Sequence, residues 1–435
     1  MTETLKIAIA GLGTVGASTI ALLQAEPTHG GSGRNIELVA VSARDKTRDR
    51  GVDLSGAKWF DDPVEMARTA AADVFVELIG GADGAALDAV EAALGAGKAV
   101  VTANKALLAA HGMKLAALAE ANNVPLLFEA AVAGGIPAIR TVRDSLAGIP
   151  IASVLGIMNG TCNYILTEME RGGRSFDDCL AEAQRLGYAE ADPTFDVDGF
   201  DTAHKLAILS SIAFTTAIDS DAVLVEGIRR IEPADLEAAE ELGFRIKLLG
   251  IATMTEEGVD QRVHPTMVPR GSALAETAGV LNAVSIRGPA FGELVLSGPG
   301  AGGMATASAV VSDLTDLARG LAPSPLGRPS ATLSPFRKAA AAGHKGAFYV
   351  RLPIADRAGA FAALASRMAA EGISLEQIVQ KTPHRPEDQP ALSDQTVILV
   401  TYPTTEAALG RALKAIEEDG IIVRAPHIIP IAHSN

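Results

Sequence analysis

Aliphatic runs of strand length alternate with helical stretches along the first third of the chain. The strand-like runs lie at 5–11, 36–43, 73–80, 98–103 and 125–132, and the helical stretches include 14–25 and 84–95. Strands that read as continuous aliphatic runs are buried on both faces, as parallel strands are when helices cover both sides of a sheet. The alternation therefore predicts an α/β fold with a doubly wound parallel sheet.

A glycine-rich turn follows the first of these strands. Gly11, Gly13 and Gly16 form a G-x-G-x-x-G pattern at the start of a helical run. The first glycine permits a tight turn, the second lets the backbone approach a pyrophosphate, and the third allows close helix packing. The glycine spacing alone is weak evidence, but here the required strand and helix stand on either side of it. We expect a Rossmann-type nucleotide-binding domain over residues 1–133.

The residues at the end of the second strand bear on the choice of cofactor. An acid at this place binds the ribose 2′-hydroxyl of NAD, whereas an arginine accommodates the 2′-phosphate of NADP. The sequence reads Ser42, Ala43, Arg44, Asp45, so the arginine precedes the acid. We therefore expect NADP as the cofactor, and Asp45 keeps NAD as the alternative.

Charge and composition argue against two classes of partner. The formal net charge is -15 and no basic stripe is present, whereas a nucleic-acid partner needs one. Apolar stretches are interrupted by charge or glycine well before membrane-spanning length, and no signal peptide precedes the first strand. The 2 cysteines lack metal-ligand spacing and indicate a reducing compartment. We expect a cytoplasmic protein with no nucleic-acid or membrane partner.

The pattern changes after residue 133 and predicts two further domains. Residues 134–300 mix strands with long helical stretches, which indicates an inserted α+β domain for catalysis and dimerisation. A glycine loop at 298–303 precedes a helix that is expected to return to the first domain and complete it at about 300–325. Residues 346–435 follow the order strand, helix, strand, strand, helix, strand, which is the ferredoxin-like pattern.

Two lysines are candidates for chemistry. Lys105 ends the segment VVTANK at the carboxyl end of a strand, where open α/β sheets bind their ligands. Its positive charge at a helix N-terminus opposes the helix dipole, so a plain surface role is disfavoured. Lys205 follows Asp201 by four residues, a spacing that places both on one helix face. Spacing alone would favour an ordinary exposed ion pair.

The segment before Lys205 is unusually rich in acids and turn formers. Its carboxylates are Glu190, Asp192, Asp196, Asp198 and Asp201. Such a cluster suits a pocket for a ligand that carries an ammonium group, and the alternative is a divalent cation held by the carboxylates. A lysine among the acids favours acid–base chemistry over metal binding. His204 is expected on another helix face and receives no role.

Four motifs in order resemble the homoserine dehydrogenase family: VVTANK, NGTCNYIL, GYAEADPTFDVDGFDTAHK and GPGAGG. The resemblance spans residue 5 to about 320, and the form of the family with a C-terminal ACT domain accounts for the rest. It implies reversible reduction of L-aspartate 4-semialdehyde to L-homoserine by NAD(P)H, in threonine, methionine and isoleucine biosynthesis. It also implies a homodimer or homotetramer.

The resemblance further implies roles for individual residues. Lys205 would be the acid–base residue, with Lys105 beside the nicotinamide and the substrate. The implied substrate-binding residues are Glu190, Asp196 and Asp201. The implied cofactor-binding residues are Gly11, Gly13, Thr14, Val15, Gly16, Arg44, Lys105 and Gly302. The stretch FEAAVAGGI resembles the family's site for a monovalent cation, taken as sodium, held by Glu129 and the backbone carbonyls of Val132, Gly134 and Ile136.

Three other readings stay open on the sequence. A semialdehyde dehydrogenase could form an acyl-thioester on Cys162, but no histidine base lies in its motif and a small buried cysteine is the commoner role. A non-catalytic amino-acid sensor is disfavoured because both lysines are present. The segment ADRAG at 355–359 suggests feedback by L-threonine, but Ala358 stands where the family usually has proline. A dimerisation module without an effector is the alternative there.

Overall fold

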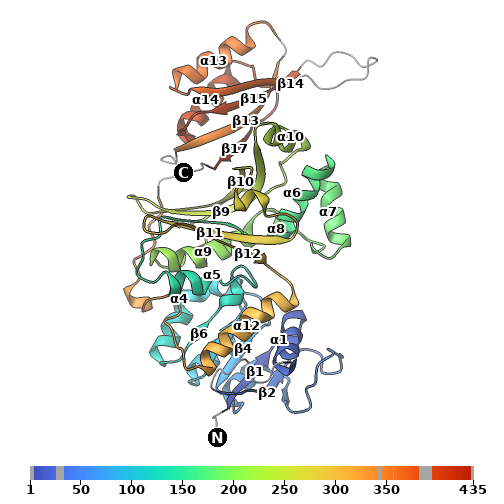
Figure 1. Ribbon diagram of the computed structural model, residues 1–435, viewed down its shortest axis with the longest axis vertical. Helices are drawn as coiled ribbons and strands as arrows, with labels where there is room; N and C mark the ends of the chain where they lie inside the picture. The colour runs from blue at the N-terminus through green and yellow to red at the C-terminus, as the bar shows by residue number, and fades with distance from the viewer. Residues whose placement is uncertain (1–3, 26–33, 340–344, 356, 382–393, 433–435) are drawn as a thin grey trace.

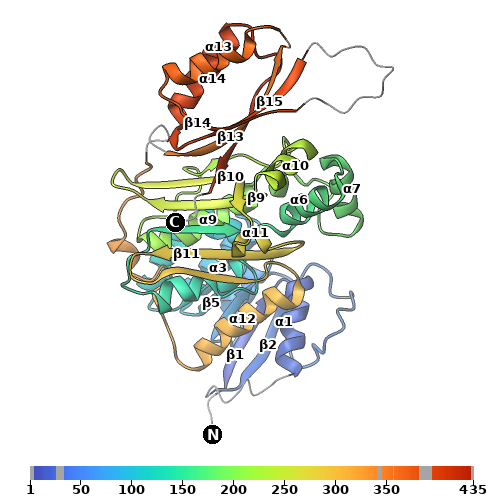
Figure 2. The same ribbon diagram turned by 45° about the horizontal axis from the view of Figure 1, so that its top comes forward.

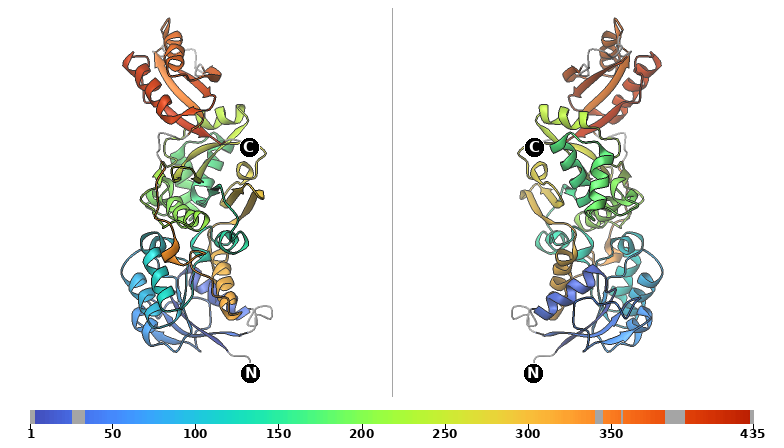
Figure 3. Two further views of the ribbon diagram at one scale, coloured as in Figure 1. Left: turned by 90° about the vertical axis from the view of Figure 1, so that its left-hand side faces the viewer. Right: turned by 90° about the vertical axis from the view of Figure 1, so that its right-hand side faces the viewer.

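The computed structural model describes residues 4–25, 34–339, 345–355, 357–381 and 394–432. The first sheet, the middle part of the chain and the C-terminal segment follow one another along the long axis (Figures 1 and 3). In the part of the chain that is described, no helix has the length and apolarity needed to cross a membrane.

The predicted parallel sheet is present near the N-terminus. Its six strands have the order β3-β2-β1-β4-β5-β6, and every neighbouring pair is parallel. The strands are β1 (Leu5–Ala10), β2 (Ile36–Ser42), β3 (Lys58–Phe60), β4 (Val74–Glu77), β5 (Ala99–Thr102) and β6 (Leu126–Leu127). The strand order reverses between β1 and β4, and ligands of such sheets bind at the carboxyl ends of the strands beside this reversal.

Helices cover both faces of this sheet. Leu5, Ile7 and Ile9 of β1 pack in one core with α1 (Thr14–Ala25) and α12 (Gly303–Ala318). Ala8 and Ala10 belong to the core on the other face, with α2 (Pro63–Thr69), α3 (Ala85–Gly95) and α4 (Lys105–Ala121). The helix after the glycine loop therefore does return to the first sheet, where α12 lies beside α1 (Figure 1).

The sequence prediction was wrong at the last strand of this sheet. The run 125–132 forms only two residues of β6, and a 3-10 turn, η1 (Glu129–Ala131), follows at once. The Glu129 carboxylate accepts the backbone N–H groups of Ile139 and Arg140. These bonds tie the turn to α5 (Ala138–Arg140), which the π-helical turn η2 (Thr141–Ser145) follows.

A second sheet runs through the rest of the molecule. Its main path is β12-β11-β7-β9-β10-β17-β13-β15-β14. The middle strands are β7 (Ser153–Ile157), β8 (Leu224–Val225), β9 (Phe244–Met254), β10 (Val259–Pro269), β11 (Leu281–Gly288) and β12 (Gly292–Pro299). The middle helices are α6 (Gly160–Gly172), α7 (Phe176–Arg185), α8 (Thr194–Val197), α9 (Phe200–Phe214), α10 (Pro233–Glu241) and α11 (Ala273–Glu276). Helices α6, α9 and α10 pack against β9.

The C-terminal segment extends the same sheet and has a core of its own. After η3 (Ser330–Thr332), it contains β13 (Lys345–Ala355), α13 (Ala360–Ala370), β14 (Leu375–Lys381), β15 (Asp394–Thr401), β16 (Thr404–Thr405), α14 (Glu406–Glu418) and β17 (His427–Ile431). Helices α13 and α14 cover one face of its strands (Figure 2). The sequence placed the last strand from residue 421, but β17 begins at His427. Strand β17 joins β10 at Met267 and Ile431.

Candidate active site

The glycine turn has the geometry that a dinucleotide site needs. Gly11 has a φ of +96°, and a Cβ there would lie 2.2 Å from the Leu78 carbonyl oxygen. A Cβ on Gly16 would lie 2.1 Å from the Gly11 oxygen, so neither position accepts a side chain. No atom lies within 4 Å of the place where a Gly13 Cβ would stand. The backbone at Gly13 is therefore open to a ligand at the start of α1, which begins at Thr14.

The second glycine loop meets the first. Gly302 has a φ of +107° and caps α12. A Cβ on Gly303 would lie 2.6 Å from Ser18 Oγ and 2.8 Å from Thr14 Cγ2. The N-terminal ends of α1 and α12 therefore lie together, and both present backbone N–H groups where a pyrophosphate could bind. This contact brings Gly302 to Thr14, although nearly 300 residues separate them in the chain.

Basic side chains lie at the end of β2. Arg44 is exposed there, and Asp45 accepts hydrogen bonds from Thr47, which lower the pKa of the Asp45 carboxyl. Arg50 reaches back to the glycine turn, where its Nε donates to the Leu12 carbonyl at 3.1 Å. The sequence analysis did not single out Arg50, because its approach to Leu12 depends on the path of the loop after β2.

Both candidate lysines converge on one buried carboxylate. Asp201, on the first turn of α9, is only 3% exposed. Its Oδ2 lies 2.7 Å from Lys205 Nζ and its Oδ1 lies 3.0 Å from Lys105 Nζ. Lys105 is the first residue of α4, at the carboxyl end of β5. The site therefore joins the edge of the first sheet to the helix that follows the acid-rich segment.

The charges of this cluster stabilise one another. Burial by itself would raise the pKa of Asp201, but the two lysines and a hydrogen bond from Asn159 hold it well below its usual range. Burial would lower the pKa of Lys105, but Asp201 raises it above its usual value, with smaller contributions from Asp196 and Glu190. The carboxylate is therefore ionised, and Lys105 carries a positive charge at neutral pH.

Asn159 links the acids of the site. Its Nδ2 donates to Asp196 Oδ1 at 2.8 Å and to Asp201 Oδ2 at 2.9 Å. Its Oδ1 caps α6 by accepting the N–H of Cys162. Burial and the neighbouring Asp201 raise the pKa of Asp196. The sequence analysis gave Asn159 no role, although an asparagine before a helical run is a recognisable N-cap signal.

The five acids of the segment divide into two groups. Asp196 and Asp201 face the lysines, and Glu190 is exposed but close enough for its charge to raise the Lys105 pKa. Asp192 instead caps Thr194, and Asp198 pairs with Arg229. Among the residues that the structure describes, no group of three or more His, Cys, Asp or Glu side chains is arranged to hold a metal ion.

Two aromatic rings lie beside Lys105. The Phe195 ring centroid lies 5.8 Å from Lys105 Nζ, and Phe195 meets the edge of the His204 ring at 5.3 Å between centroids. Burial lowers the pKa of His204, so this imidazole is neutral at physiological pH. The sequence analysis gave His204 no role, and the structure places it near the cluster without a hydrogen bond to Lys205.

Cys162 lacks the surroundings of a nucleophile. Its side chain is fully buried, and Sγ donates to the Asp196 carbonyl at 3.2 Å. Burial and the nearby acids raise the thiol pKa well above its usual value. A reactive cysteine needs an exposed, electropositive setting that favours the thiolate. The structure therefore disfavours the acyl-thioester reading.

A second buried polar group, which sequence reasoning missed, supports the edge of the first sheet. Glu77 ends β4 and has no exposed surface. Its carboxylate accepts the N–H groups of Ile79 and Gly80 and the hydroxyl of Thr102. Thr102 in turn accepts the N–H of Asn104, the N-cap of α4. This network fixes the helix start that carries Lys105.

The stretch with the predicted cation ligands lies against the second glycine loop. Glu129 is 3% exposed, and burial raises its pKa. Its backbone N–H donates to Asp313 Oδ2 at 2.9 Å. Gly134 has a φ of +57°, and a Cβ there would lie 2.3 Å from the Gly300 oxygen. Of the predicted ligands Glu129, Val132, Gly134 and Ile136, the last two therefore lie against the second glycine loop, since a Cβ on Gly298 would also lie 3.4 Å from Ile136.

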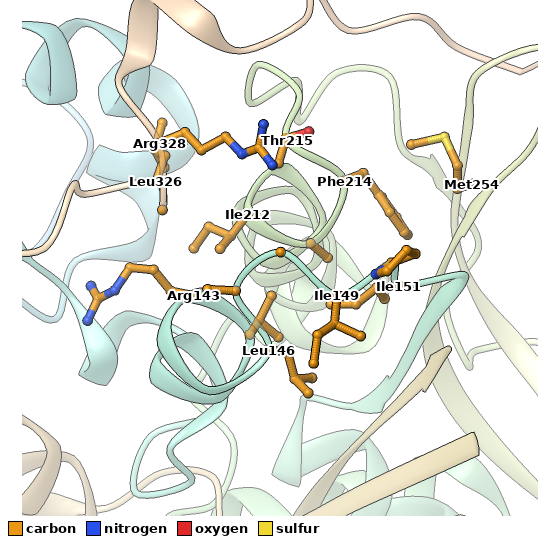
Figure 4. Close-up of a pocket in the computed structure, with 16 residues that line it drawn as sticks. Arg143, Leu146, Ile149, Ile151, Ile212, Phe214, Thr215, Met254, Leu326 and Arg328 are labelled. Atoms are coloured by element: carbon orange, nitrogen blue, oxygen red, sulfur yellow. The ribbon is translucent and has the colours of Figure 1, made fainter. Parts of the chain in front are cut away.

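A separate apolar cavity of about 280 Å³ lies at the far end of α9 (Figure 4). Its labelled lining includes Leu146, Ile149, Ile212 and Phe214. Arg143 also lines it, but this guanidinium is paired with Asp144. The lysine cluster lies at the first turn of α9 and this cavity lies at its last, so the two are distinct places.

Comparison with known proteins agrees with the site. The family model described as homoserine dehydrogenase matches residues 137–315, and the model of the homoserine dehydrogenase NAD-binding domain matches residues 11–129. A homoserine dehydrogenase from Pseudomonas aeruginosa is 43% identical over 427 residues, 95% of each chain.

Solved structures agree with these matches. The crystal structure of a homoserine dehydrogenase from Thiobacillus denitrificans matches with a TM-score of 0.91 at 39% identity, covering 99% of this chain and 98% of that one. A hyperthermophilic archaeal homoserine dehydrogenase in complex with NADPH matches 73% of this chain and 98% of its own, with a TM-score of 0.64 at 26% identity. This chain therefore belongs to the homoserine dehydrogenase family of NAD(P)-dependent oxidoreductases, which act on homoserine or its semialdehyde.

Proposed function

We propose that the chain catalyses the reversible reduction of L-aspartate 4-semialdehyde to L-homoserine, with Lys205 as the acid–base residue. The observation that carries this proposal is the sharing of the Asp201 carboxylate by Lys205 and Lys105 at distances of 2.7 and 3.0 Å. Lys105 is the first residue of α4 and lies at the carboxyl end of β5. The glycine turn after β1 lies at the same edge of this parallel sheet. A cofactor bound at that turn would therefore lie toward the lysines.

The hydrogen bonds of Lys205 leave one donor for the substrate. A lysine ammonium has three N–H groups. One donates to Asp201 and one to the Met158 carbonyl, at 2.7 Å each. The third can protonate the oxygen of the aldehyde as it becomes an alkoxide. A bound dihydronicotinamide supplies the hydride. In the oxidising direction Lys205 has to accept the proton, so homoserine oxidation should become faster as the pH rises.

The remaining charges suit a zwitterionic substrate. The carboxylates of Glu190 and Asp196, whose charges act on Lys105, could receive the substrate ammonium. Burial and Asp201 raise the pKa of Asp196, and a bound ammonium would favour its ionised form. Asp201 holds both lysines, and Lys105 is partly exposed, with 33% of its side-chain surface accessible. We assign Lys105 to contact with the substrate and the nicotinamide.

For the cofactor we propose NADP over NAD. Arg44 is exposed at the end of β2, and Arg50 adds a second guanidinium near the glycine turn. Thr14, Val15 and Gly302 lie at the adjoining helix starts, in position to contact the pyrophosphate. The archaeal relative solved with NADPH supports this choice. The check is the ratio of kcat/KM for NADPH and NADH, which should move toward NADH in Arg44→Ala.

Sodium fits the stretch after β6. The Glu129 carboxylate has about four acceptor positions, and the N–H groups of Ile139 and Arg140 use two of them. The others can serve a cation together with the backbone carbonyls of Val132, Gly134 and Ile136. Burial raises the pKa of Glu129, and a cation would favour its charged form. We propose that a bound sodium ion would fix this turn against the second glycine loop.

We further propose that residues 134–300 are the catalytic and dimerisation domain and residues 346–435 an ACT domain with L-threonine as its effector. The order of elements from β13 to β17 supports the second assignment. Gly359, with a φ of +87°, makes the turn before α13, whereas Asp356 of ADRAG lies outside the described residues. The protein would act as a homodimer or homotetramer in threonine, methionine and isoleucine biosynthesis.

One assay tests the central proposal. NADPH oxidation is followed with aspartate semialdehyde, with and without threonine, for the wild type and for Lys205→Ala. We expect turnover in the wild type and a loss of about 10²–10⁴-fold in kcat for the variant. A wild type that is inert with this aldehyde would refute the substrate. A variant with normal turnover would move the acid–base role elsewhere, and unchanged activity at saturating threonine would refute the feedback alone.

A further inference from the structure

A cavity lined mainly by basic side chains lies where the C-terminal segment meets the start of α10. Its volume is about 310 Å³, and its charged lining residues are Arg229, Arg230, Glu232, Arg351, Arg424 and His427. Four arginines and one acid line this cavity in a chain whose formal net charge is -15, and three acids outside the lining, Asp198, Glu226 and Asp235, pair with three of the arginines. A local reversal of charge in a concave place is the arrangement that attracts a small anion.

The wall on the C-terminal side is fixed before any ligand arrives. Asp235 on α10 has no exposed surface. It accepts a hydrogen bond from Arg351 Nε at 2.8 Å and lies 3.1 Å from His427 Nδ1. A buried carboxylate behind an arginine holds the planar guanidinium in one orientation. Arg351 Nη1 also donates to Glu232 at 2.8 Å and Nη2 to Asp235 at 3.2 Å, so each of these two nitrogens keeps one further N–H group.

The opposite wall carries side chains that can still rearrange. The side chains of Arg229 and Arg230 are 43% and 55% exposed. Arg230 donates to the Pro426 carbonyl at 2.8 Å, and its charge partner Glu226 lies 3.7 Å away. Exposed ion pairs of this kind contribute little free energy. An oxyanion in the cavity would offer the guanidinium fork a stronger, bidentate partner.

The same wall is attached to the acid-rich loop of the active site. The Ile228 N–H donates to the Val197 carbonyl at 2.9 Å, and Arg229 Nε lies 2.5 Å from Asp198 Oδ1. A Cβ on Gly227 would lie 2.2 Å from the Val197 oxygen, so the two segments are in tight backbone contact. Asp196 belongs to the same short helix, α8. A change at Arg229 therefore reaches Asp196 through one hydrogen-bonded segment.

We infer that this cavity binds a small multivalent oxyanion, and that the occupant competes with Asp198 for Arg229 and so alters the position of Asp196. The first half of the inference stands on the cavity alone. The second half rests on the proposed function, because it assigns Asp196 to substrate binding. A binding measurement and a kinetic measurement therefore separate the two.

Binding is tested with inorganic phosphate on the full-length protein, by titration calorimetry at constant ionic strength set with chloride. Saturating NADPH is present so that phosphate cannot enter the dinucleotide turn. We expect binding in the wild type and at least about tenfold weaker binding in Arg230→Met/Arg424→Met. The control Arg411→Met removes one exposed arginine on α14 that pairs with Glu371 and does not line the cavity, and it should bind as the wild type does.

Equal affinity in the wild type and the double variant would show that phosphate binds elsewhere or adventitiously, and would overturn the site. If the double variant has a lower melting temperature than the wild type, Arg230→Lys/Arg424→Lys replaces it. We expect this variant to bind phosphate with intermediate affinity, because lysine keeps the positive charge but cannot form the bidentate contact of a guanidinium. Kinetically, phosphate should change the wild-type KM for homoserine about twofold or more and leave that of the double variant unchanged. Binding without any change in KM would overturn the coupling to Asp196.

Discussion

Two buried lysines of the middle part of the chain differ in what surrounds their ammonium groups. Lys205 on α9 is 9% exposed and lies 2.7 Å from the Asp201 carboxylate. Lys247 on β9 is 2% exposed and donates to neutral oxygens, those of the Asn163 side chain at 3.1 Å and the Thr277 backbone at 2.7 Å. Burial lowers the pKa of Lys247 to about 8. Both ammonium groups are therefore buried, but Lys205 donates to a carboxylate and a carbonyl, whereas Lys247 donates to neutral oxygens.

The surroundings of the two lysines differ in the same way: Lys205 belongs to a cluster of charges, whereas Lys247 links elements of the fold by hydrogen bonds. Next to Lys205 the chain places a carboxylate that a second lysine shares, and the hydrogen bonds to Asp201 and Met158 use two of the three N–H groups of its ammonium. Around Lys247 it places Asn163 and the loop before β11, so the ammonium joins β9, α6 and that loop. Lys205 therefore has a charged partner for its ammonium group, whereas Lys247 bears a desolvation cost without one among its hydrogen-bond partners.

Among the changes that test this comparison, the largest effect is expected when the carboxylate between the lysines loses its charge. In Asp201→Asn the two ammonium groups repel each other without a counter-charge, and we expect kcat to fall about 10²–10³-fold. Steady-state oxidation of homoserine measures this. The matched control is Asp192→Asn, which changes an acid of the same segment that only caps Thr194. If Asp201→Asn kept most of its turnover, the distinction between the two lysines would fail.

Much of the lysine site was predictable because local signals agreed with the fold. Gly11 and Gly16 accept no side chain, so their pattern marks the turn directly, and the spacing of Asp201 and Lys205 places both on one face of α9. Asn159 donates to Asp201 only because α6 and α9 are close in space, and no spacing of residues in the sequence predicts that contact. Lys247 reads in the sequence as an ordinary strand residue, since only the tertiary packing shows what surrounds it.

The next effect concerns stability and pH. The Lys247 pKa of about 8 lies below the ordinary value of 10.5, so between these values the unfolded chain binds the proton more tightly. Stability should therefore rise with pH, by roughly 2 kcal/mol from pH 7.5 to 9.5 for this group alone. Lys247→Met should lack that gain. Urea unfolding at both pH values measures it, and an equal gain in wild type and variant would place the titration elsewhere.

A cation at Glu129 would have surroundings intermediate between those of Lys205 and Lys247, because one carboxylate and several neutral carbonyls would surround it. We expect sodium to stabilise the wild type by about 1 kcal/mol over choline at the same ionic strength, through its binding to the folded state. Glu129→Gln should lose this difference, because the remaining neutral oxygens balance no charge. Thermal melts in the two salts measure it. A variant that still responds to sodium would remove Glu129 from the site.

The smallest effect tests whether Lys247 truly lacks an ionic partner. Its nearest acids, Glu170 and Glu276, also lie beside Arg245, and Glu276 is 53% exposed. Because water screens such a charge, Glu276→Gln should change the free energy of unfolding by less than about 0.5 kcal/mol at pH 7.5. Urea unfolding at low and high salt measures it. A loss in the free energy of unfolding above about 1 kcal/mol that salt abolishes would mean that an ion pair holds Lys247, as one holds Lys205. The difference in hydrogen-bond partners would then no longer distinguish the two lysines.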